Sequence, residues 1–206
     1  MHKESYSDSK LMLDSVSKIQ IFDTPWPHGI IDNTISESLA TSLIKEIFEK
    51  EVFLKTYKDK GNKTYSMSTC QVLPSLGPAS KIFLTTVNSL EYRMMLQQFF
   101  DRDILTKPVR VDAWQYGSGD WLSPHVDKPE KIITQVLYLS SDWVPEDSGY
   151  FALMSSNNLD SIVKRIEPLY LRSVVFSPND LSWHCVEKLS TTCQGRKSFT
   201  ITYLQD

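Results

Sequence analysis

Residues 123–139 read SPHVDKPEKIITQVLYL, which places His125 two residues before Asp127 and just ahead of an alternating apolar run. Alternate residues of a strand project to the same side, so this imidazole and this carboxylate could reach one metal ion. The pair alone is weak evidence, because H-x-D occurs often by chance and is equally compatible with an ordinary turn. A metal site therefore requires further ligands elsewhere in the chain.

His184 supplies a second imidazole, in the stretch SPNDLSWHCVE. Four strands fit between Asp127 and His184, which is enough to bring the chain back across a sandwich. Two imidazoles and one carboxylate form the facial set that leaves positions open on Fe(II). Zn²⁺ with a bound water could use the same ligands, so the residue types alone leave the metal open. We assign His2 to an N-terminal arm and His28, in TPWPHG, to a structural role.

Arg196 opens the segment GRKSFTITYL, in which Ser198 and Thr200 project to the same side. Alone, such an arginine is compatible with an ordinary surface charge. An inward arginine in a β-barrel is costly unless an anion meets it, and its planar fork suits a carboxylate. Tyr138, after an alternating strand, could add a hydroxyl. A metal at one end of the site and a guanidinium at the other would hold a dicarboxylate such as 2-oxoglutarate.

The elements that must position these residues divide the chain into two parts. Residues 1–17 are rich in Ser, Lys and Asp and predict a flexible N-terminal arm, whereas residues 18–206 predict a single domain. Within residues 34–100 we expect helical support. Thr34 and Glu37 have capping-box spacing, and a second helical region follows Gly77-Pro78 with a break near Ser89.

From residue 109 to residue 204 the sequence consists of short segments that predict β-strands, separated by turn residues. Helices followed by closely spaced strands favour an α+β fold, mainly β, with helices packed on an antiparallel sandwich or barrel. The expected strands are 109–117, 132–139, 149–154, 165–171, 173–178 and 198–204.

The composition excludes several classes of partner. The 206 residues carry a formal charge of −3, so no basic field attracts nucleic acid, and no stretch approaches the length of a membrane span. The three cysteines form no CxxC pair, and the N-terminus lacks an apolar signal core. We therefore expect reduced thiols in a cytoplasmic protein that is a monomer or homodimer.

Taken together, these residues resemble the 2-oxoglutarate- and Fe(II)-dependent dioxygenases, specifically the prolyl-4-hydroxylase-like branch. The stretch YGSGDWLSPHVD matches the motif Y-G-x-G-x-x-x-x-H-x-D of that family, and VLYLSSDW is similar to a segment of animal oxygen-sensing prolyl hydroxylases. The resemblance implies a double-stranded β-helix, a jelly-roll and cupin-like fold with supporting N-terminal helices. It implies Fe(II), 2-oxoglutarate and O₂ as cofactors, with ascorbate as a possible aid to activity.

The resemblance also implies roles for individual residues. The metal ligands would be His125, Asp127 and His184, and Arg196 would bind 2-oxoglutarate, with Tyr138 and Thr200 at the distal carboxylate and Tyr116 near the cosubstrate. Halogenating members replace the ligand carboxylate with a small residue, so the intact Asp127 disfavours halogenation. Many members have Gly-Gly where this chain has Gly149-Tyr150, which puts an aromatic side chain near the expected entrance.

The activity implied is hydroxylation of an unactivated C–H bond in an amino acid or related small metabolite, with succinate and CO₂ as coproducts. Candidate substrate contacts are Trp114, Gln115, Lys128 and Tyr150, together with Arg110. The alternatives are a protein or peptidyl prolyl hydroxylase, or the same chemistry used for desaturation, cyclisation or C–C cleavage. Outside this class stand a non-catalytic jelly-roll binding module and a cupin-like zinc hydrolase.

Overall fold

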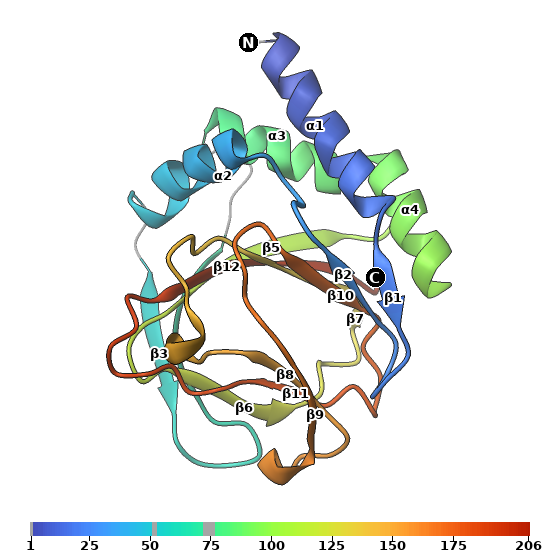
Figure 1. The fold of residues 1–206 in the computed structure, drawn as a ribbon. Helices are drawn as coiled ribbons and strands as arrows, with labels where there is room; N and C mark the ends of the chain where they lie inside the picture. Colours follow the sequence, from blue (N-terminus) through green and yellow to red (C-terminus); the bar gives the residue numbers. More distant parts are fainter. Residues whose placement is uncertain (1, 51–52, 72–76) are drawn as a thin grey trace.

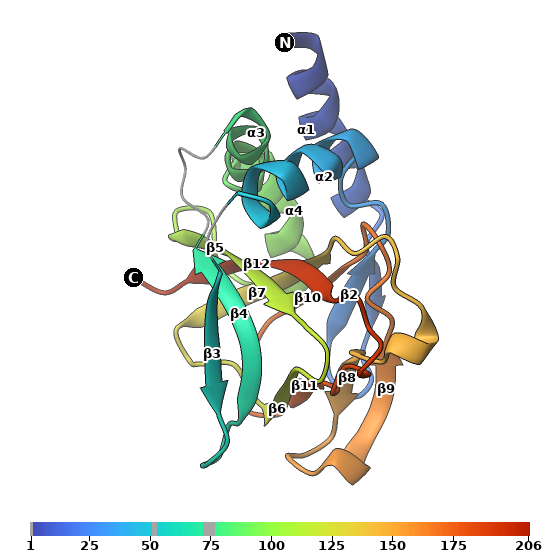
Figure 2. The same cartoon turned by 90° about the vertical axis from the view of Figure 1, so that its left-hand side faces the viewer.

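Helices gather on one side of the β-structure in the computed structural model, which describes residues 2–50, 53–71 and 77–206 (Figures 1 and 2). They are α1 (His2–Val16), α2 (Glu37–Leu43), α3 (Pro78–Val87) and α4 (Leu90–Phe100), and a π-helical turn, η1 (Ile44–Phe48), continues α2. The break between α3 and α4 falls at Ser89, as predicted; the Ser89 hydroxyl accepts a hydrogen bond from the backbone N–H of Tyr92 and so begins α4.

Twelve strands make up the rest of the described fold, and all of their pairings are antiparallel. Short 3₁₀ turns, η2 (Pro145–Asp147) and η3 (Leu159–Ser161), lie in the connections on either side of β8. The strands are β1 (Gln20–Phe22), β2 (His28–Ile31), β3 (Leu54–Lys58), β4 (Tyr65–Gln71), β5 (Val109–Tyr116), β6 (Trp121–His125), β7 (Lys131–Tyr138), β8 (Phe151–Met154), β9 (Ile162–Ile166), β10 (Ser173–Phe176), β11 (His184–Val186) and β12 (Arg196–Leu204).

The strand order places two sheet layers face to face. One layer runs β1-β2-β10-β7-β12-β5 and the other runs β6-β11-β8-β9. Strand β4 joins the layers because it pairs with both β5 and β6, and β3 pairs with β4 alone. This arrangement is the double-stranded β-helix that the sequence predicted, with the helices covering the outer face of the first layer (Figure 2).

The alternation of β12 separates the packed core from the interior of the barrel. Phe199, Ile201 and Tyr203 are fully buried beneath the helices, in a core that also contains Phe83 of α3 and Leu96 of α4. The intervening residues of the strand therefore face the space between the two layers. The sequence of a single strand thus supplies both the support for the helices and one wall of the interior.

The N-terminal segment differs from the expectation of a loose arm. Residues 2–16 form helix α1, whose last two turns bury Met12 and Val16 completely in the core beneath the helical layer. The Ser9 hydroxyl also lies 2.8 Å from the Thr86 hydroxyl of α3. Polar composition favoured disorder, but two apolar residues one helical turn apart are sufficient to dock the helix.

Two further expectations about local structure need correction. The N-cap of α2 is Ser36, whose hydroxyl accepts a hydrogen bond from the Leu39 N–H at 3.0 Å, rather than Thr34. Thr34 is buried and donates to the Ser173 hydroxyl instead. The sequence reading also missed strands β3, β4 and β6, which are short or rich in polar residues. No helix in the described ranges is both long and apolar enough to cross a membrane.

Candidate metal centre and cosubstrate cavity

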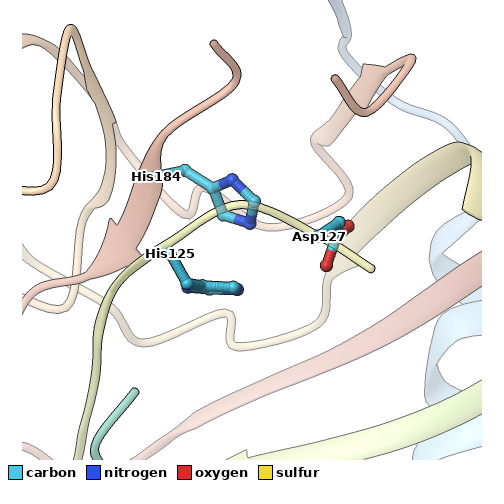
Figure 3. A group of neighbouring side chains, drawn as sticks. All are labelled: His125, Asp127 and His184. Atoms are coloured by element: carbon cyan, nitrogen blue, oxygen red, sulfur yellow. The ribbon is translucent and has the colours of Figure 1, made fainter. Parts of the chain in front are cut away.

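His125, Asp127 and His184 converge on one point inside the barrel (Figure 3). His125 ends β6 and His184 begins β11, and the two residues are direct partners in the pairing of these strands. Their ring centroids lie 4.3 Å apart. Asp127 follows β6 by two residues, and one ligand atom from each of the three side chains lies within 4.8 Å of the others. The predicted H-x-D…H set is therefore brought together as expected.

Both histidines are held in the tautomer that a metal requires. The Nδ1–H of His125 donates to the Ser123 carbonyl at 2.9 Å, and the Nδ1–H of His184 donates to the Ser182 carbonyl at 2.8 Å. Each Nε2 is therefore left with a free lone pair. Burial lowers the pKa of His125 and of His184, which keeps both rings neutral.

Asp127 is fixed by two side chains of β7. Its Oδ1 accepts a hydrogen bond from the Lys131 ammonium at 2.6 Å, and its Oδ2 accepts one from the Thr134 hydroxyl at 2.9 Å. Burial raises the pKa of Asp127, but the charge and the hydrogen bond of Lys131 oppose this effect, and the pKa stays below its ordinary value, so the carboxyl is ionised. Two neutral imidazoles and one carboxylate fit the donor set of a non-haem Fe(II) site.

A buried carboxylate shapes the turn that leads into β6. Asp120 accepts hydrogen bonds from the Gly117 N–H at 2.8 Å, from the Ser66 hydroxyl at 2.5 Å and from the Lys55 ammonium at 2.5 Å. Gly119 has φ +74°, a conformation that glycine adopts without strain. The GSGD portion of the motif therefore has a structural task, which is to turn the chain so that β6 delivers His125 and Asp127 to the interior.

A cavity of about 220 Å³ contains the three candidate ligands and extends along β12 to Arg196. Alternate residues of β5, β7 and β12 form its wall, as expected for the inward faces of antiparallel strands. Its lining residues are Lys63, Met67, Arg110, Asp112, Trp114, Tyr116, Leu122, His125, Asp127, Lys128, Glu130, Lys131, Thr134, Val136, Phe151, Phe176, His184, Val186, Arg196, Ser198, Thr200 and Thr202.

Arg196 is a buried guanidinium for which the described residues provide no anionic partner. Arg196 is 2% exposed, and it takes part in none of the ion pairs among the described residues. The rings of Tyr116 and Tyr138 lie 5.2 and 4.8 Å from the guanidinium carbon. Arg196 Nε and the Tyr138 hydroxyl are both buried without a hydrogen-bond partner among the described residues. A buried guanidinium without a partner lowers the stability of the fold, and a bound anion would remove this penalty.

The two tyrosines near Arg196 remain protonated phenols. Burial raises the pKa of Tyr116 to about 12 and also raises the pKa of Tyr138, although the positive charge of Arg196 opposes both shifts. The Tyr116 hydroxyl lies 3.3 Å from the sulfur of Met67. Thr200 lines the cavity farther along β12, so its contact with a carboxylate held by Arg196 stays a prediction.

The candidate substrate residues divide between the cavity and the outside. Trp114, Lys128 and Arg110 line the cavity. Gln115 does not, because it follows Trp114 on β5 and its side chain leaves from the opposite face of the sheet. Tyr150 is likewise absent from the lining. Its ring packs edge-on against Trp143 at 5.4 Å, and its hydroxyl lies 3.4 Å from the Pro145 carbonyl, so the aromatic side chain does not narrow the cavity.

Sequence reasoning missed three polar residues beside the metal ligands. Thr134 shares the inward face of β7 with Val136, and that alternation was a usable signal. Lys131 stands four residues after Asp127, a spacing that means little without the turn between them. Lys63 comes from the distant β3–β4 connection, and the sequence contains no pattern that places it there.

The comparisons with known proteins agree with this geometry. Residues 111–204 match the family model described as the 2OG-Fe(II) oxygenase superfamily. No curated protein shows significant sequence similarity to the chain.

Among solved structures, the fold is similar to that of a prolyl-4-hydroxylase from Pseudomonas putida, with a TM-score of 0.69 and 16% identity over 96% of this chain and 98% of that one. It is also similar to a prolyl hydroxylase from Trichoplax adhaerens, solved in complex with a peptide fragment of hypoxia inducible factor. There the TM-score is 0.67 and the identity 17%, over 98% of this chain and 91% of that one. A third match is HygX from Streptomyces hygroscopicus, solved with nickel and 2-oxoglutarate, with a TM-score of 0.60 and 11% identity over 86% of this chain and 82% of that one.

Proposed function

Since residues 111–204 match the 2OG-Fe(II) oxygenase superfamily, we propose that the chain is an oxygenase of this kind and that it hydroxylates an unactivated C–H bond of an amino acid or related small metabolite. Fe(II), 2-oxoglutarate and O₂ are the cofactors of this superfamily. The observation that carries the proposal is the pairing of two complementary features in one cavity. A three-residue candidate ligand set occupies one part, and a buried arginine that has no anionic partner within residues 2–50, 53–71 and 77–206 occupies another.

The candidate site residues then have the following roles. His125, Asp127 and His184 would hold Fe(II), and Arg196 would bind the distal carboxylate of 2-oxoglutarate with the Tyr138 hydroxyl as a further donor. Iron and 2-oxoglutarate held by these residues would supply the oxidant from O₂, with succinate and CO₂ as coproducts. Thr200 and Tyr116 would border the cosubstrate from β12 and β5.

The protein itself contributes position and the exclusion of water. Hydrogen bonds from Lys131 and Thr134 hold the Asp127 carboxylate in one orientation. The backbone carbonyls of Ser123 and Ser182 hold the two imidazoles with Nε2 toward the cavity. Phe151 and Phe176 line the cavity on the side of His184, with ring centroids 5.1 Å from that imidazole, and keep this side of the site dry.

A peptidyl prolyl hydroxylase is the second candidate. The observation in its favour is that two of the similar folds belong to prolyl hydroxylases, one of them solved with a peptide. At 16% and 17% identity these likenesses concern the fold, so they leave the substrate open. Desaturation, cyclisation and C–C cleavage use the same ligands and are distinguished by the product alone.

The experiment that tests the proposal measures succinate formed from 2-oxoglutarate with Fe(II) and O₂, together with bound metal per chain. We expect His184→Ala and Asp127→Ala to lose metal and to abolish succinate formation. Asp180→Ala, which removes an exposed carboxylate near His184 in sequence, is the matched control and should behave as the wild type. Undiminished succinate formation by His184→Ala would refute the assignment.

A search for the product distinguishes the two candidate functions. The wild-type enzyme is incubated with free amino acids and, separately, with proline-containing peptides. Products are examined by mass spectrometry for the gain of one oxygen atom. Hydroxylation of a free amino acid supports the first candidate, and hydroxylation confined to the peptides supports the second.

A further inference from the structure

Lys63 is a positively charged side chain of the cavity that forms no ion pair with a described residue. It lies in the β3–β4 connection, is partly buried and lines the cavity together with the candidate metal ligands. Three other cations of the lining each face a carboxylate, in the pairs Lys131–Asp127 at 2.6 Å, Arg110–Asp112 at 2.9 Å and Lys128–Glu130 at 3.7 Å. The remaining one, Arg196, is almost completely buried and is already proposed to bind 2-oxoglutarate. Among the described residues, Lys63 has neither an ion pair nor a side-chain hydrogen bond.

The backbone next to Lys63 is fixed to the strand that carries the metal ligands. The Thr64 N–H donates to the Ser123 hydroxyl at 2.7 Å, and the Ser123 N–H donates to the Thr64 carbonyl at 2.9 Å. Ser123 also accepts the Nδ1–H of His125 on its carbonyl. A continuous set of hydrogen bonds therefore holds the root of the Lys63 side chain beside the metal centre, so its place in the cavity follows from the fold.

The charges around Lys63 favour the binding of an anion. Lys131 and Lys128 repel the Lys63 ammonium, and Asp127, its main attractive neighbour, is already bonded to Lys131. Burial together with these charges lowers the pKa of Lys63 to about 8. In the proposed complex one carboxylate of 2-oxoglutarate would pair with Arg196 and the other would face the metal, so neither would be left to pair with the ammonium of Lys63. One compact ammonium is the complement of one carboxylate.

We propose that Lys63 is a specificity-determining residue that binds a free carboxylate of the substrate at the cavity mouth. The substrate class is then a small carboxylic acid such as a free amino acid, rather than an internal residue of a peptide. The inference rests on the proposed function and narrows it. It adds a contact outside the metal and cosubstrate sites.

The test compares free amino acids with their C-terminal amides, because the amide removes the negative charge and little else. Ligand binding is measured by thermal shift and calorimetry with 2-oxoglutarate and Ni(II) in place of Fe(II), so that no turnover consumes the ligand. The variants are Lys63→Met, which keeps the length of the side chain, and Lys63→Arg, which keeps the charge. Lys60→Met removes an exposed lysine of the same connection and serves as the control.

We expect at least one free amino acid to bind the wild type at least about tenfold more tightly than its amide, which is the loss of one charge-assisted hydrogen bond. In Lys63→Met the free acid and the amide should bind equally weakly. Lys63→Arg should restore part of the preference, and Lys60→Met should match the wild type. The affinity for 2-oxoglutarate should be the same in all four proteins.

Three results would overturn the inference. The first is a wild type that binds amides or peptides as tightly as free acids, or that binds no free amino acid. The second is an unchanged preference in Lys63→Met, and the third is a loss of 2-oxoglutarate affinity in that variant, which would assign Lys63 to the cosubstrate. Substrate-independent succinate formation by the Fe(II) enzyme separates the two levels. Its presence with the second or third result rejects the Lys63 contact alone, and with the first result it rejects the amino-acid substrate as well but leaves the oxygenase chemistry standing. Its absence from the wild type rejects the proposed function.

Discussion

Replacing Arg196 with methionine should separate two energies that usually change together. The guanidinium belongs to a residue that is 2% exposed and has no described anionic partner, so in the free protein its charge is a burden on stability. When a carboxylate binds, the same charge becomes one half of a buried ion pair. Arg196→Met should therefore impair cosubstrate binding severely while leaving the free protein about as stable as the wild type.

The magnitude follows from the buried geometry. Truncating one partner of a buried, hydrogen-bonded charge pair costs about 2–5 kcal/mol. At 1.4 kcal/mol per factor of ten, this predicts a loss of roughly 30- to 4,000-fold in the affinity for 2-oxoglutarate. In the free protein the variant gives up the attraction of the guanidinium to the rings of Tyr116 and Tyr138, about 0.5–2 kcal/mol each. The relief of an unpaired buried charge offsets that loss.

Calorimetry with Ni(II) gives the affinity for 2-oxoglutarate, and thermal unfolding with and without the ligand gives the stability. The wild type should gain stability with rising 2-oxoglutarate concentration, whereas Arg196→Met should gain little. Arg165→Met removes an exposed arginine that pairs with Glu187 and is the matched control. If Arg196→Met binds 2-oxoglutarate within about threefold of the wild type, or if the free variant fails to fold, the reasoning about an awaited anion is wrong.

Two further predictions concern polar groups around the site. Thr134→Val removes a hydrogen bond to Asp127 and should lower metal affinity by about 10- to 100-fold without changing 2-oxoglutarate affinity at saturating metal. The control is Thr202→Val, because Thr202 lies opposite Thr134 and its buried hydroxyl has no hydrogen-bond partner among the described residues. This variant should leave both affinities unchanged. Equal effects in the two variants would contradict the proposed role of Thr134 in holding Asp127. Burial lowers the pKa of His28 below 6.5 in the folded protein. Near pH 6.5 the imidazole of His28 is therefore protonated in the unfolded chain but not in the folded one, so the free energy of unfolding falls as the pH drops below 6.5. His28→Gln should therefore lose less stability than the wild type between about pH 7 and pH 5 in urea unfolding, and parallel losses would show that His28 does not titrate in this way.

The sequence was a sufficient guide wherever a local pattern reports directly on position. Alternation along β12 predicted that Arg196, Ser198 and Thr200 share one face, because successive side chains of a strand must point to opposite faces. The spacing of His125 and Asp127 predicted that both could serve one ion. Arg196, on the inward face of its strand, predicted a buried cation that awaits an anion, and the cavity has this arrangement.

Some elements were misread because their stability comes from distant parts of the chain. Helix α1 has a polar sequence, and its order depends on Met12 and Val16 reaching a core built from helices far along the chain. Gln115 was chosen for its polarity, although the pleat of β5 directs it away from the cavity. Strand β6 is too short to recognise alone and is stabilised by pairing with β4 and β11, which come from distant parts of the chain.

The amino-acid sequence by itself predicted the candidate ligand types, the candidate cosubstrate anchor and the fold class, because each depends on residue identity and short-range periodicity. Tertiary structure alone decided which charges balance one another. Lys131 finds Asp127 across a turn, and Lys63 reaches the same cavity from the distant β3–β4 connection. Electrostatic pairing depends on distance in space, so no linear pattern could have shown that Lys63 has no ion pair within the part of the chain that the structure describes.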